Sequence, residues 1–410
     1  MKIVLVHNSY KFPGGEDVVF KNERSLLQSA GHEVISYCRS NFETDKYPGI
    51  RRVQLAAQTV WSGQTKRQFG ELLRLHRPDV VHVHNTLAII SPSVYSACWQ
   101  LKIPVVQTLH NYRLLCPAGS LFRDGHACSE CVDHSLWRGV WHGCYRGSRA
   151  ATGVVAATLK AHRWAGTWTS KIDIYIALTR YARREFIEGG LPANKIVVKP
   201  NFVSVDPGEH DGRQGSYFLF IGRLTREKGL QTLLRAWELL PRNIPLCVVG
   251  DGPIRPDLQQ ISGRAGLTQV SFLGQQSQAK VQELMKGALC VVFPSEWPEQ
   301  FGLVTIESFA CSVPVLTSNV KALEDIVSHD RTGLIFRSAD PADLAEKVQF
   351  AWKNQDYMRT LGQNARGEYL DKYTSKKNLA MLIEIYKRAI DSRAAGRPPA
   401  FDQSSGLEAA

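Results

Sequence analysis

Short apolar runs alternate with helical patterns along most of the chain. In the first half the runs of strand length are Lys2–Val6, Val34–Tyr37, Asp79–His84, Val105–Thr108, Ile174–Leu178 and Ile196–Lys199. In the second half they are Tyr217–Ile221, Leu246–Val249, Val270–Leu273, Cys290–Phe293, Val313–Thr317 and Leu334–Phe336. Near-continuous apolar strands joined by helical segments are typical of parallel sheets that helices cover on both faces. The pattern therefore predicts an α/β fold.

The number of strands also predicts how the chain divides. The runs are too many for one open sheet, so we expect two doubly wound, Rossmann-like domains. A polar, turn-rich stretch at residues 206–212 favours a boundary there, with domains at 1–204 and 205–374. We expect a last helix at about 375–392 to pack back on the first domain. The Pro-, Gly-, Ser- and Ala-rich tail 394–410 is predicted to be disordered.

Charge distinguishes the two halves. The 410 residues carry a formal net charge of +12. Residues 1–199 contain 26 Lys and Arg against 14 Asp and Glu, whereas the remainder contains 24 of each. A basic half favours an anionic partner, such as a membrane surface, a phosphorylated acceptor or a nucleic acid. Because no apolar run is long enough to span a bilayer and the start is too short for a signal peptide, we expect a cytoplasmic protein.

A basic loop follows the first strand of the second half. Gly222 allows close approach to the backbone there, and Arg223 and Lys228 place two cations beyond the strand end. Ligands of doubly wound sheets bind at that edge, and two cations suit a diphosphate. A solvated basic loop is the alternative interpretation.

A second segment, "PEQFGLVTIE", carries two glutamates. Glu299 follows the strand 290–293, and Gly302 opens a predicted helix whose first N–H groups, at 303–305, are expected to be free for an anion. Glu307 lies one turn inside that helix, and its side chain leans back toward the helix start. The two carboxylates are therefore candidate readers of hydroxyl groups on either side of a diphosphate. Alternatively, Glu307 interacts with the helix dipole and Glu299 is solvated.

The motifs "GRLTREKG", "GDGP", "FPSEWPEQFGLVTIESFACSVPV" and "DRTGLIF" resemble the C-terminal domain of glycosyltransferase family 4. These are retaining nucleotide-sugar transferases with the GT-B fold, in which two Rossmann-like domains face an interdomain cleft. The resemblance covers about Phe218–Phe336 closely and the first half more loosely. Two departures are Ser312, where the family usually has Gly, and residues 319–322, where a glycine pair is common.

The resemblance implies a role for each site residue. Glu307 is expected to hold the nucleotide ribose and Glu299 the donor sugar, while Arg223 and Lys228 contact the diphosphate. The implied nucleotide-sugar-binding set is Gly14, Gly15, Gly222, Arg223, Lys228, Glu299, Phe301, Gly302, Leu303, Val304 and Glu307. The implied catalytic set is His110, Glu299, Arg223 and Lys228. No metal or other cofactor is expected to be required for catalysis.

The first half adds the acceptor side of the site. Gly14-Gly15 resembles the glycine-rich loop that shapes the acceptor site of the family, although an ordinary turn is the alternative. His110 resembles the cleft histidine that contacts the donor sugar, and His84 is a candidate to brace it. The implied reaction is a front-face attack with retention, in which positioning and stabilisation of the departing phosphate supply most of the catalysis.

Four cysteines cluster in an insertion at about 113–147. Cys116, Cys128, Cys131 and Cys144 have a spacing that is compatible with a structural zinc site. Reduced thiols and disulfides are the alternatives, and a cytoplasmic location disfavours disulfides. Asp124-Gly125, between the cysteines, predicts a hairpin turn.

Residues 134–171 contain no acidic residue. Four tryptophans, Trp137, Trp141, Trp164 and Trp168, alternate there with Arg and Lys. This composition favours a segment that lies on an anionic membrane. A core helix with a solvated face and a single-stranded nucleic-acid site are the alternatives, and we expect no nucleic-acid partner.

The sequence thus predicts a retaining transferase that moves a sugar from a nucleotide diphosphate to a lipid-linked or polysaccharide acceptor. We expect it to be peripheral on the inner face of the cell membrane. Two alternatives remain: a nucleotide-sugar epimerase or hydrolase with the same fold, and a non-catalytic, membrane-associated nucleotide-sugar-binding protein.

Overall fold

The computed structural model describes residues 1–11, 14–46, 49–209 and 215–396. The chain divides into two compact units. Unit 1 contains Met1–Leu121, Cys128–Pro200 and the chain from Asn378 onward, and unit 2 contains Phe122–Ala127 and Asn201–Lys377. The start of the predicted disordered tail is helical as far as Ala395, and residues 397–410 lie outside this description.

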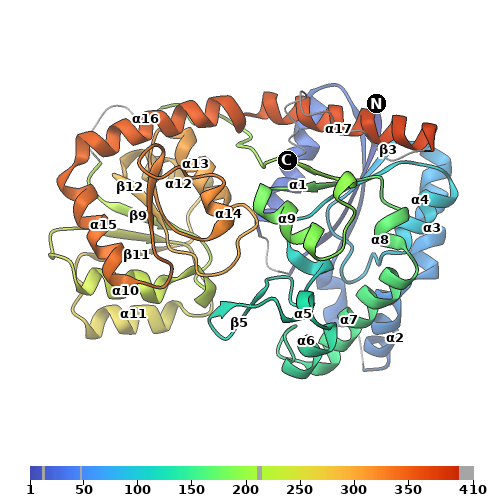
Figure 1. Ribbon diagram of the computed structural model, residues 1–410, viewed down its shortest axis with the longest axis horizontal. Helices are drawn as coiled ribbons and strands as arrows, with labels where there is room; N and C mark the ends of the chain where they lie inside the picture. The colour runs from blue at the N-terminus through green and yellow to red at the C-terminus, as the bar shows by residue number, and fades with distance from the viewer. Residues whose placement is uncertain (12–13, 47–48, 210–214, 397–410) are drawn as a thin grey trace. The chain divides into compact units, whose positions relative to one another are not determined.

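Unit 1 is built on one six-stranded parallel sheet (Figure 1). Its strands are β1 (Lys2–Ser9), β2 (Glu33–Ser40), β3 (Val80–Val83), β4 (Val105–Thr108), β7 (Ile174–Ala177) and β8 (Ile196–Val198). They lie in the order β2-β1-β3-β4-β7-β8. The helices are α1 (Gly15–Ser29), α2 (Gly49–Val60), α3 (Gly63–His76), α4 (Ser93–Gln100), α5 (Glu130–Asp133), α6 (Leu136–His142), α7 (Arg149–Trp164), α8 (Thr167–Ser170) and α9 (Arg180–Glu188). Short 3-10 helices are η1 (Asn41–Lys46), η2 (Tyr112–Leu114) and η3 (Ala193–Lys195).

Unit 2 contains a second six-stranded parallel sheet. Its strands are β9 (Phe218–Ile221), β10 (Leu246–Val249), β11 (Val270–Gly274), β12 (Cys290–Phe293), β13 (Val315–Ser318) and β14 (Gly333–Phe336), in the order β11-β10-β9-β12-β13-β14. The helices are η4 (Arg226–Lys228), α10 (Leu230–Glu238), α11 (Arg255–Arg264), α12 (Gln278–Gly287), α13 (Leu303–Ala310), α14 (Lys321–Glu324), α15 (Pro341–Lys353) and α16 (Gln355–Lys372). The predicted pair of doubly wound α/β sheets is therefore confirmed.

The last helix, α17 (Ser375–Ala395), contributes to the core of unit 1. Leu382, Ile385, Tyr386 and Ala389 are fully buried and lie at the spacing of one helix face. They belong to the same apolar cluster as Ile3 and other side chains of the unit 1 sheet. The helix at the C-terminal end of the described chain therefore packs on the N-terminal sheet and forms part of the core of unit 1.

A small antiparallel hairpin separates the cysteines of the insertion. Its strands are β5 (Phe122–Arg123) and β6 (His126–Ala127). Asp124 and Gly125 between them have φ angles of 52° and 85°. Two consecutive left-handed residues are what a tight hairpin turn requires, so the turn predicted from the Asp-Gly pair is confirmed.

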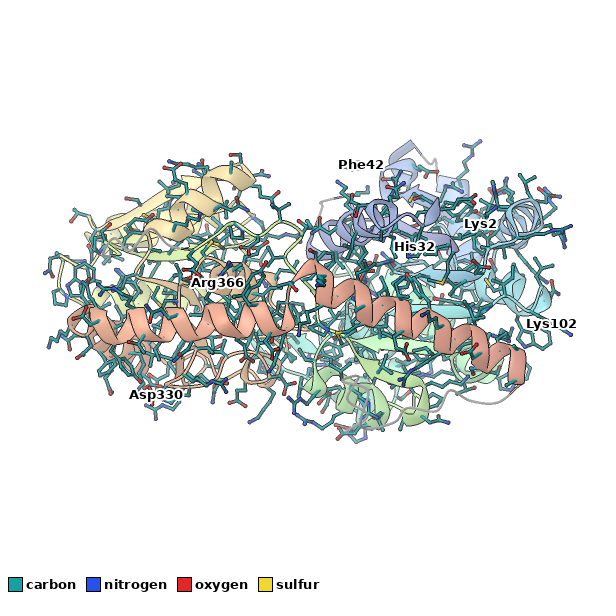
Figure 2. The ribbon with its side chains drawn as sticks, turned by 90° about the horizontal axis from the view of Figure 1, so that it is seen from above. Lys2, His32, Phe42, Lys102, Asp330 and Arg366 are labelled. Carbon is teal, nitrogen blue, oxygen red and sulfur yellow. The ribbon has the colours of Figure 1, made fainter. Side chains whose placement is uncertain are left out.

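Arg366 on α16 (Figure 2) ties together three parts of unit 2. Its guanidinium donates to both carboxylate oxygens of Asp206, at 2.7 and 2.8 Å, and to the carbonyl of Ala310 at 2.7 Å. A two-pronged guanidinium–carboxylate pair fixes geometry better than a single contact. This pair therefore fixes the turn-rich segment at Asp206 to the end of α13. Among the described residues, no helix is both long and apolar enough to cross a membrane.

The packing of α17 leads to a stability prediction. Leu382→Ala should lower the free energy of unfolding of unit 1 by about 2–5 kcal/mol, because it leaves a cavity in a fully buried site. The matched control is Leu370→Ala on α16, whose side chain is 46% exposed and whose loss should cost no more than about 0.5 kcal/mol. Urea unfolding of the full chain measures both. Equal effects of the two changes would contradict the packing described here.

Candidate active site

Two loops of unit 2 meet beyond the carboxyl ends of β9 and β12. Gly229 ends the first loop at a φ of 71°, and a Cβ atom there would lie 1.8 Å from the carbonyl oxygen of Pro294. The Glu296 N–H donates to the carbonyl of Glu227 at 2.9 Å. Only glycine permits this backbone approach, and the approach brings Lys228 to the second loop.

Lys228 and Glu299 are direct partners, although 71 positions separate them. The Lys228 ammonium lies 2.5 Å from Oε1 of Glu299, and the Ser295 hydroxyl donates to the same oxygen at 2.8 Å. The ammonium also lies 5.3 Å from the ring centre of Phe293 and 5.4 Å from that of Trp297. An ammonium has three N–H donors. Lys228 can therefore orient the nearly buried Glu299 and still donate to a phosphate.

The helix α13 begins beside Glu299 without a side-chain cap. Its Ncap residue, Gly302, has a φ of 79°. The expectation of three free N–H groups was wrong at Thr305, whose N–H donates to the Gly302 carbonyl at 3.0 Å. Leu303 and Val304 occupy the first two helical positions, where an N–H has no acceptor within its own helix. Those two groups can bind an anion.

Glu307 lies one turn inside α13. It is half-buried, and burial raises the pKa of its carboxyl group. Its carboxylate has no hydrogen-bond or ion-pair partner among the residues that the structure describes. A partly buried carboxylate without a partner beside an anion site is suited to accept hydrogen bonds from the hydroxyls of a ligand.

Three neighbouring side chains have buried polar atoms without a hydrogen-bond partner in the described parts of the chain. They are Nε1 of Trp297, both amide atoms of Gln300 and the hydroxyl of Thr305. Buried polar groups in native proteins are nearly always satisfied by protein, water or ligand. Segment 297–305 therefore offers both donors and acceptors to a polar ligand.

The other predicted residues of unit 2 have different surroundings. Arg223 is exposed on the loop after β9. Gly222 is held beside β10 by its N–H, which donates to the Val249 carbonyl at 3.0 Å. Phe301 is buried, with its ring centre 6.1 Å from that of Tyr373. Its ring therefore packs in the interior, and its part in nucleotide-sugar binding stays a prediction.

In unit 1, Gly14 and Gly15 start α1. The Gly14 N–H donates to Oδ2 of Asp17 at 2.9 Å, and Oδ1 of Asp17 lies 2.9 Å from Nε2 of His7. Asp17 therefore links the glycine loop to the end of β1. His7 was not selected from the sequence, because it lies within an apolar strand.

His84 and His110 follow β3 and β4, and the structure brings them together. Nδ1 of His84 lies 2.9 Å from Nε2 of His110, and the rings are stacked. Burial, with neighbouring histidines as a further cause, lowers the pKa of both imidazoles well below the usual value. Both rings are therefore neutral at pH 7, and His84 braces His110 as expected.

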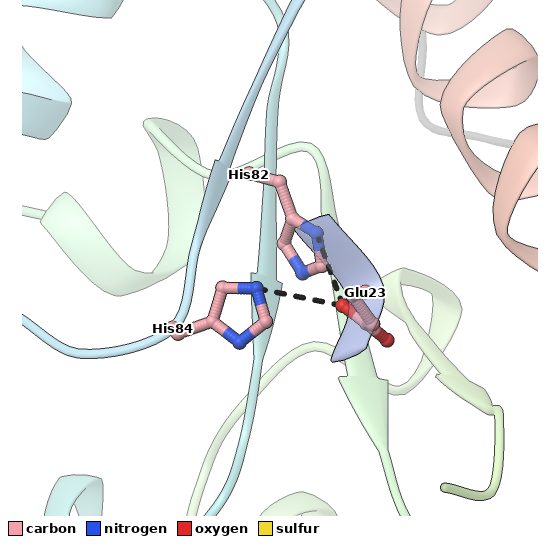
Figure 3. A group of neighbouring side chains, drawn as sticks. All are labelled: Glu23, His82 and His84. Atoms are coloured by element: carbon pink, nitrogen blue, oxygen red, sulfur yellow. Dashed lines mark ion pairs between the residues drawn. The ribbon is translucent and has the colours of Figure 1, made fainter. Parts of the chain in front are cut away.

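His84 also belongs to a buried group with His82 and Glu23 (Figure 3), and Glu23 is the member that the sequence analysis did not select. Glu23 comes from α1, where Val19, Phe20 and Leu27 are also buried. An acidic residue on the apolar face of a helix was the available signal. Oε1 of Glu23 accepts from the Lys199 ammonium at 2.8 Å, and both side chains are about 1% exposed.

Glu16 was also missed. Burial and the nearby Asp17 carboxylate raise the pKa of Glu16 to about 8. Oε2 of Glu16 accepts from the Asn111 amide at 3.2 Å, and Asn111 is the neighbour of His110. A carboxyl group that stays protonated near neutral pH can donate a hydrogen bond, which marks this place as a candidate for substrate contact.

The four cysteines are only partly gathered. The thiols of Cys116 and Cys131 are hydrogen-bonded to each other. That bond, aided by the backbone groups of Ala118, Gly119 and Leu121, lowers the pKa of Cys116. Among the described residues, Glu23, His82 and His84 are the one group of three candidate ligands within 4.8 Å of one another. A tetrahedral zinc site would require Cys128 and Cys144 to move toward the pair, so zinc stays a prediction.

Comparison with known proteins identifies the class. A crystal structure of HepE from Anabaena in complex with UDP superposes with a TM-score of 0.67 and 18% sequence identity, over 94% of this chain and all of that one. The two parallel-sheet units thus have the fold of the GT-B glycosyltransferases.

Matches to family models identify the family. Residues 13–207 match the model described as Glycosyltransferase Family 4, and residues 210–368 match Glycosyl transferases group 1. Together the two matches cover most of the chain. The protein belongs to these glycosyltransferases.

Curated relatives agree. Two uncharacterised glycosyltransferases of Methanocaldococcus jannaschii are 28% identical over 54% of this chain and 62% of their own, and 24% identical over 95% and 99%. The O-antigen chain mannosyltransferase C of Escherichia coli is 24% identical over 49% of this chain and 56% of its own. The match to the first of these relatives and the match to the mannosyltransferase therefore each span less than two thirds of that relative's length.

The geometry of α13 leads to a binding prediction. Glu307→Ala should weaken binding of the preferred nucleoside diphosphate at least about tenfold, because hydrogen bonds from ribose hydroxyls to a charged group are lost. Isothermal titration calorimetry with UDP, GDP, ADP and dTDP measures this. The control is Glu283→Ala on α12, whose side chain is 68% exposed. Unchanged affinity in Glu307→Ala would remove the ribose assignment.

The cysteine cluster leads to a metal prediction. If the quartet holds zinc, the purified full chain contains about one zinc per chain, and Cys128→Ser loses it. Cys38→Ser, an exposed cysteine outside the cluster, should keep the metal. Elemental analysis with a chelator-dependent melting curve decides. A zinc-free protein whose melting temperature ignores chelators has four thiols there and no metal.

Proposed function

We propose that the protein is a retaining glycosyltransferase that moves a sugar from a nucleotide diphosphate to an acceptor. One observation carries this proposal. The Lys228–Glu299 pair lies in the same segment as the uncapped start of α13, with the unpaired Glu307 one turn further on. This arrangement offers a cation and N–H groups for a diphosphate, and one carboxylate for hydroxyls on each side of it.

The proposed chemistry needs no covalent nucleophile. The diphosphate departs toward Arg223, Lys228 and the start of α13, which stabilise its developing charge. The acceptor attacks from the same face, so the anomeric configuration is retained, and a phosphate oxygen of the donor takes the proton. Catalysis is then mostly positioning and preorganised charge, and no metal is required.

On the unit 1 side, we propose that His110 contacts the donor sugar. Its ring is neutral and half-buried, and His84 holds it at 2.9 Å. A neutral imidazole has one unprotonated ring nitrogen, which can accept a hydrogen bond from a hydroxyl group of the sugar. Gly14 and Gly15, at the start of α1, are the proposed acceptor-side loop.

We propose that the acceptor is a lipid-linked or polysaccharide precursor and that unit 1 meets it on an anionic membrane, at the cytoplasmic face. Trp137, Trp141 and Trp164 are 68%, 70% and 92% exposed. Arg138, Arg146, Arg149 and Lys160 are exposed in the same segment. Exposed indoles interleaved with cations fit a lipid interface. Trp168 is the exception, because it is 4% exposed and belongs to the core.

Turnover tests the proposed function. Each of UDP-, GDP-, ADP- and dTDP-hexose is incubated with the full chain, with and without polyprenyl-phosphate-linked sugar acceptors. We expect nucleotide release that depends on acceptor, and an α-configured donor giving an α-linked product by NMR. Release without any acceptor would favour the hydrolase or epimerase. Tight nucleotide-sugar binding without turnover would favour a binding protein.

The membrane proposal makes its own prediction. In vesicle flotation at low salt, the wild type should float with vesicles containing anionic phosphatidylglycerol and stay behind with phosphatidylcholine alone. Trp137→Ser combined with Trp141→Ser should reduce flotation, because the interfacial contact of two indoles is lost. Trp99→Ser, which changes a 53% exposed tryptophan outside the segment, is the control. Wild-type protein that stays out of the lipid fraction would refute the membrane face.

A further inference from the structure

A network of polar side chains extends from His110 into the interior of unit 1. Nε2 of His110 lies 2.9 Å from Nδ1 of His84, and Nε2 of His84 lies 3.4 Å from Oε2 of Glu23. Oε1 of Glu23 accepts from Lys199 at 2.8 Å, and Lys199 also donates to Oδ1 of Asn378 at 3.0 Å. The last residue comes from α17, so five segments distant in sequence contribute to this network.

The three ligand-type side chains in Figure 3 do not read as a metal site. The Lys199 ammonium is already bound to the Glu23 carboxylate, and a second cation beside it would be repelled. His82 is also engaged on both ring nitrogens, by the hydroxyls of Tyr386 and Thr108, each at 2.8 Å. The group is therefore held by hydrogen bonds to its neighbours and by the close His84–Glu23 contact, and it is not a set of open ligands.

The donor and acceptor capacities of the groups in this network determine which ring nitrogen of each histidine carries the proton. Glu23 accepts from the Lys199 ammonium, and a carboxylate paired with an ammonium has no proton to donate. Oε2 of Glu23 and Nε2 of His84 are both buried, and neither has a hydrogen-bond partner in the described chain. They face each other at 3.4 Å, so the negative carboxylate stabilises a proton on Nε2, whereas a bare Nε2 would place its lone pair against that charge. The proton of His84 therefore belongs on Nε2, pointing to Glu23. A neutral imidazole has one proton, so Nδ1 of His84 accepts, and Nε2 of His110 must donate to it.

We propose that Glu23 and His84 are positioning residues that hold His110 as the neutral tautomer protonated on Nε2. Nδ1 of His110 is then an acceptor. Within the described residues it makes no hydrogen bond, and the ring is half-buried. The tautomer of His110 follows from the side-chain network alone. Its consequence rests on the proposed function: the donor sugar presents a hydroxyl hydrogen to Nδ1, and sugars with a carboxylate or carbonyl oxygen at that position are rejected.

The wild-type protein gives the first test, without substrate. In full-length protein with 15N-labelled histidine, long-range proton–nitrogen correlations report which ring nitrogen carries the proton. A His110→Asn spectrum identifies the His110 signals. We expect His110 with a protonated Nε2 and a bare Nδ1 at pH 7. A proton on Nδ1, or a charged ring, overturns the proposal.

A pair of variants tests the cause. In Glu23→Gln the Lys199 ammonium holds the amide oxygen, so the amide NH2 faces His84 and both histidine tautomers should invert. Adding Lys199→Met removes the cation, frees the amide to turn its oxygen to His84, and should restore the original tautomers. Glu33→Gln, which changes an exposed glutamate of unit 1, is the matched control. Unchanged tautomers in Glu23→Gln, or no restoration in the double variant, overturn the proposal.

Turnover of the same variants separates this inference from the proposed function. If both hold, kcat/KM falls at least about tenfold in Glu23→Gln and recovers in the double variant, following the tautomer. If the tautomers invert but turnover does not change, the proposed contact between His110 and the sugar is wrong, whereas the tautomer assignment from the network stands. Absence of turnover in the wild type, with the predicted tautomer present, sinks the proposed function alone.

Discussion

The parallel register of the two sheets is the constraint on which the rest of the molecule depends. Parallel strands bring their carboxyl ends to one edge, so side chains that follow different strands meet there. In unit 2 this brings Lys228, which follows β9, against Glu299, which follows β12. In unit 1 it brings His84 after β3 against His110 after β4. The candidate chemistry of both units therefore comes from adjacent strands.

Two buried or nearly buried Lys–Glu pairs serve different purposes. Lys199 and Glu23 are about 1% exposed, and their charges are satisfied only by other protein groups. Removing either partner would leave an uncompensated charge in the interior, so this pair fixes the arrangement of α1, β8 and α17. Lys228 is 20% exposed and lies over two aromatic rings. It keeps donors available to a ligand, as a site residue must.

The strands of the two sheets could be predicted from the sequence more fully than the side-chain contacts of the candidate sites. Apolar runs located the twelve strands of the two large sheets, because most of these strands are buried on both faces and therefore contain long apolar stretches. The sequence also selected Lys228, Glu299 and Glu307, which follow strands of one sheet. The acidic position on the apolar face of α1 was a signal for Glu23, but its partners could not be predicted, because only the fold places Lys199 beside it. Trp168 was misassigned because composition does not distinguish the two faces of a helical segment.

The central claim is that a nucleotide diphosphate binds unit 2 between the loop after β9 and the start of α13. Hydrogen–deuterium exchange of the full chain, with and without the nucleotide that stabilises it most, tests this directly. The account predicts slower exchange in peptides covering residues 222–229 and 299–307, where backbone N–H groups and Lys228 would contact phosphate. Protection confined to other peptides of the protein would contradict it.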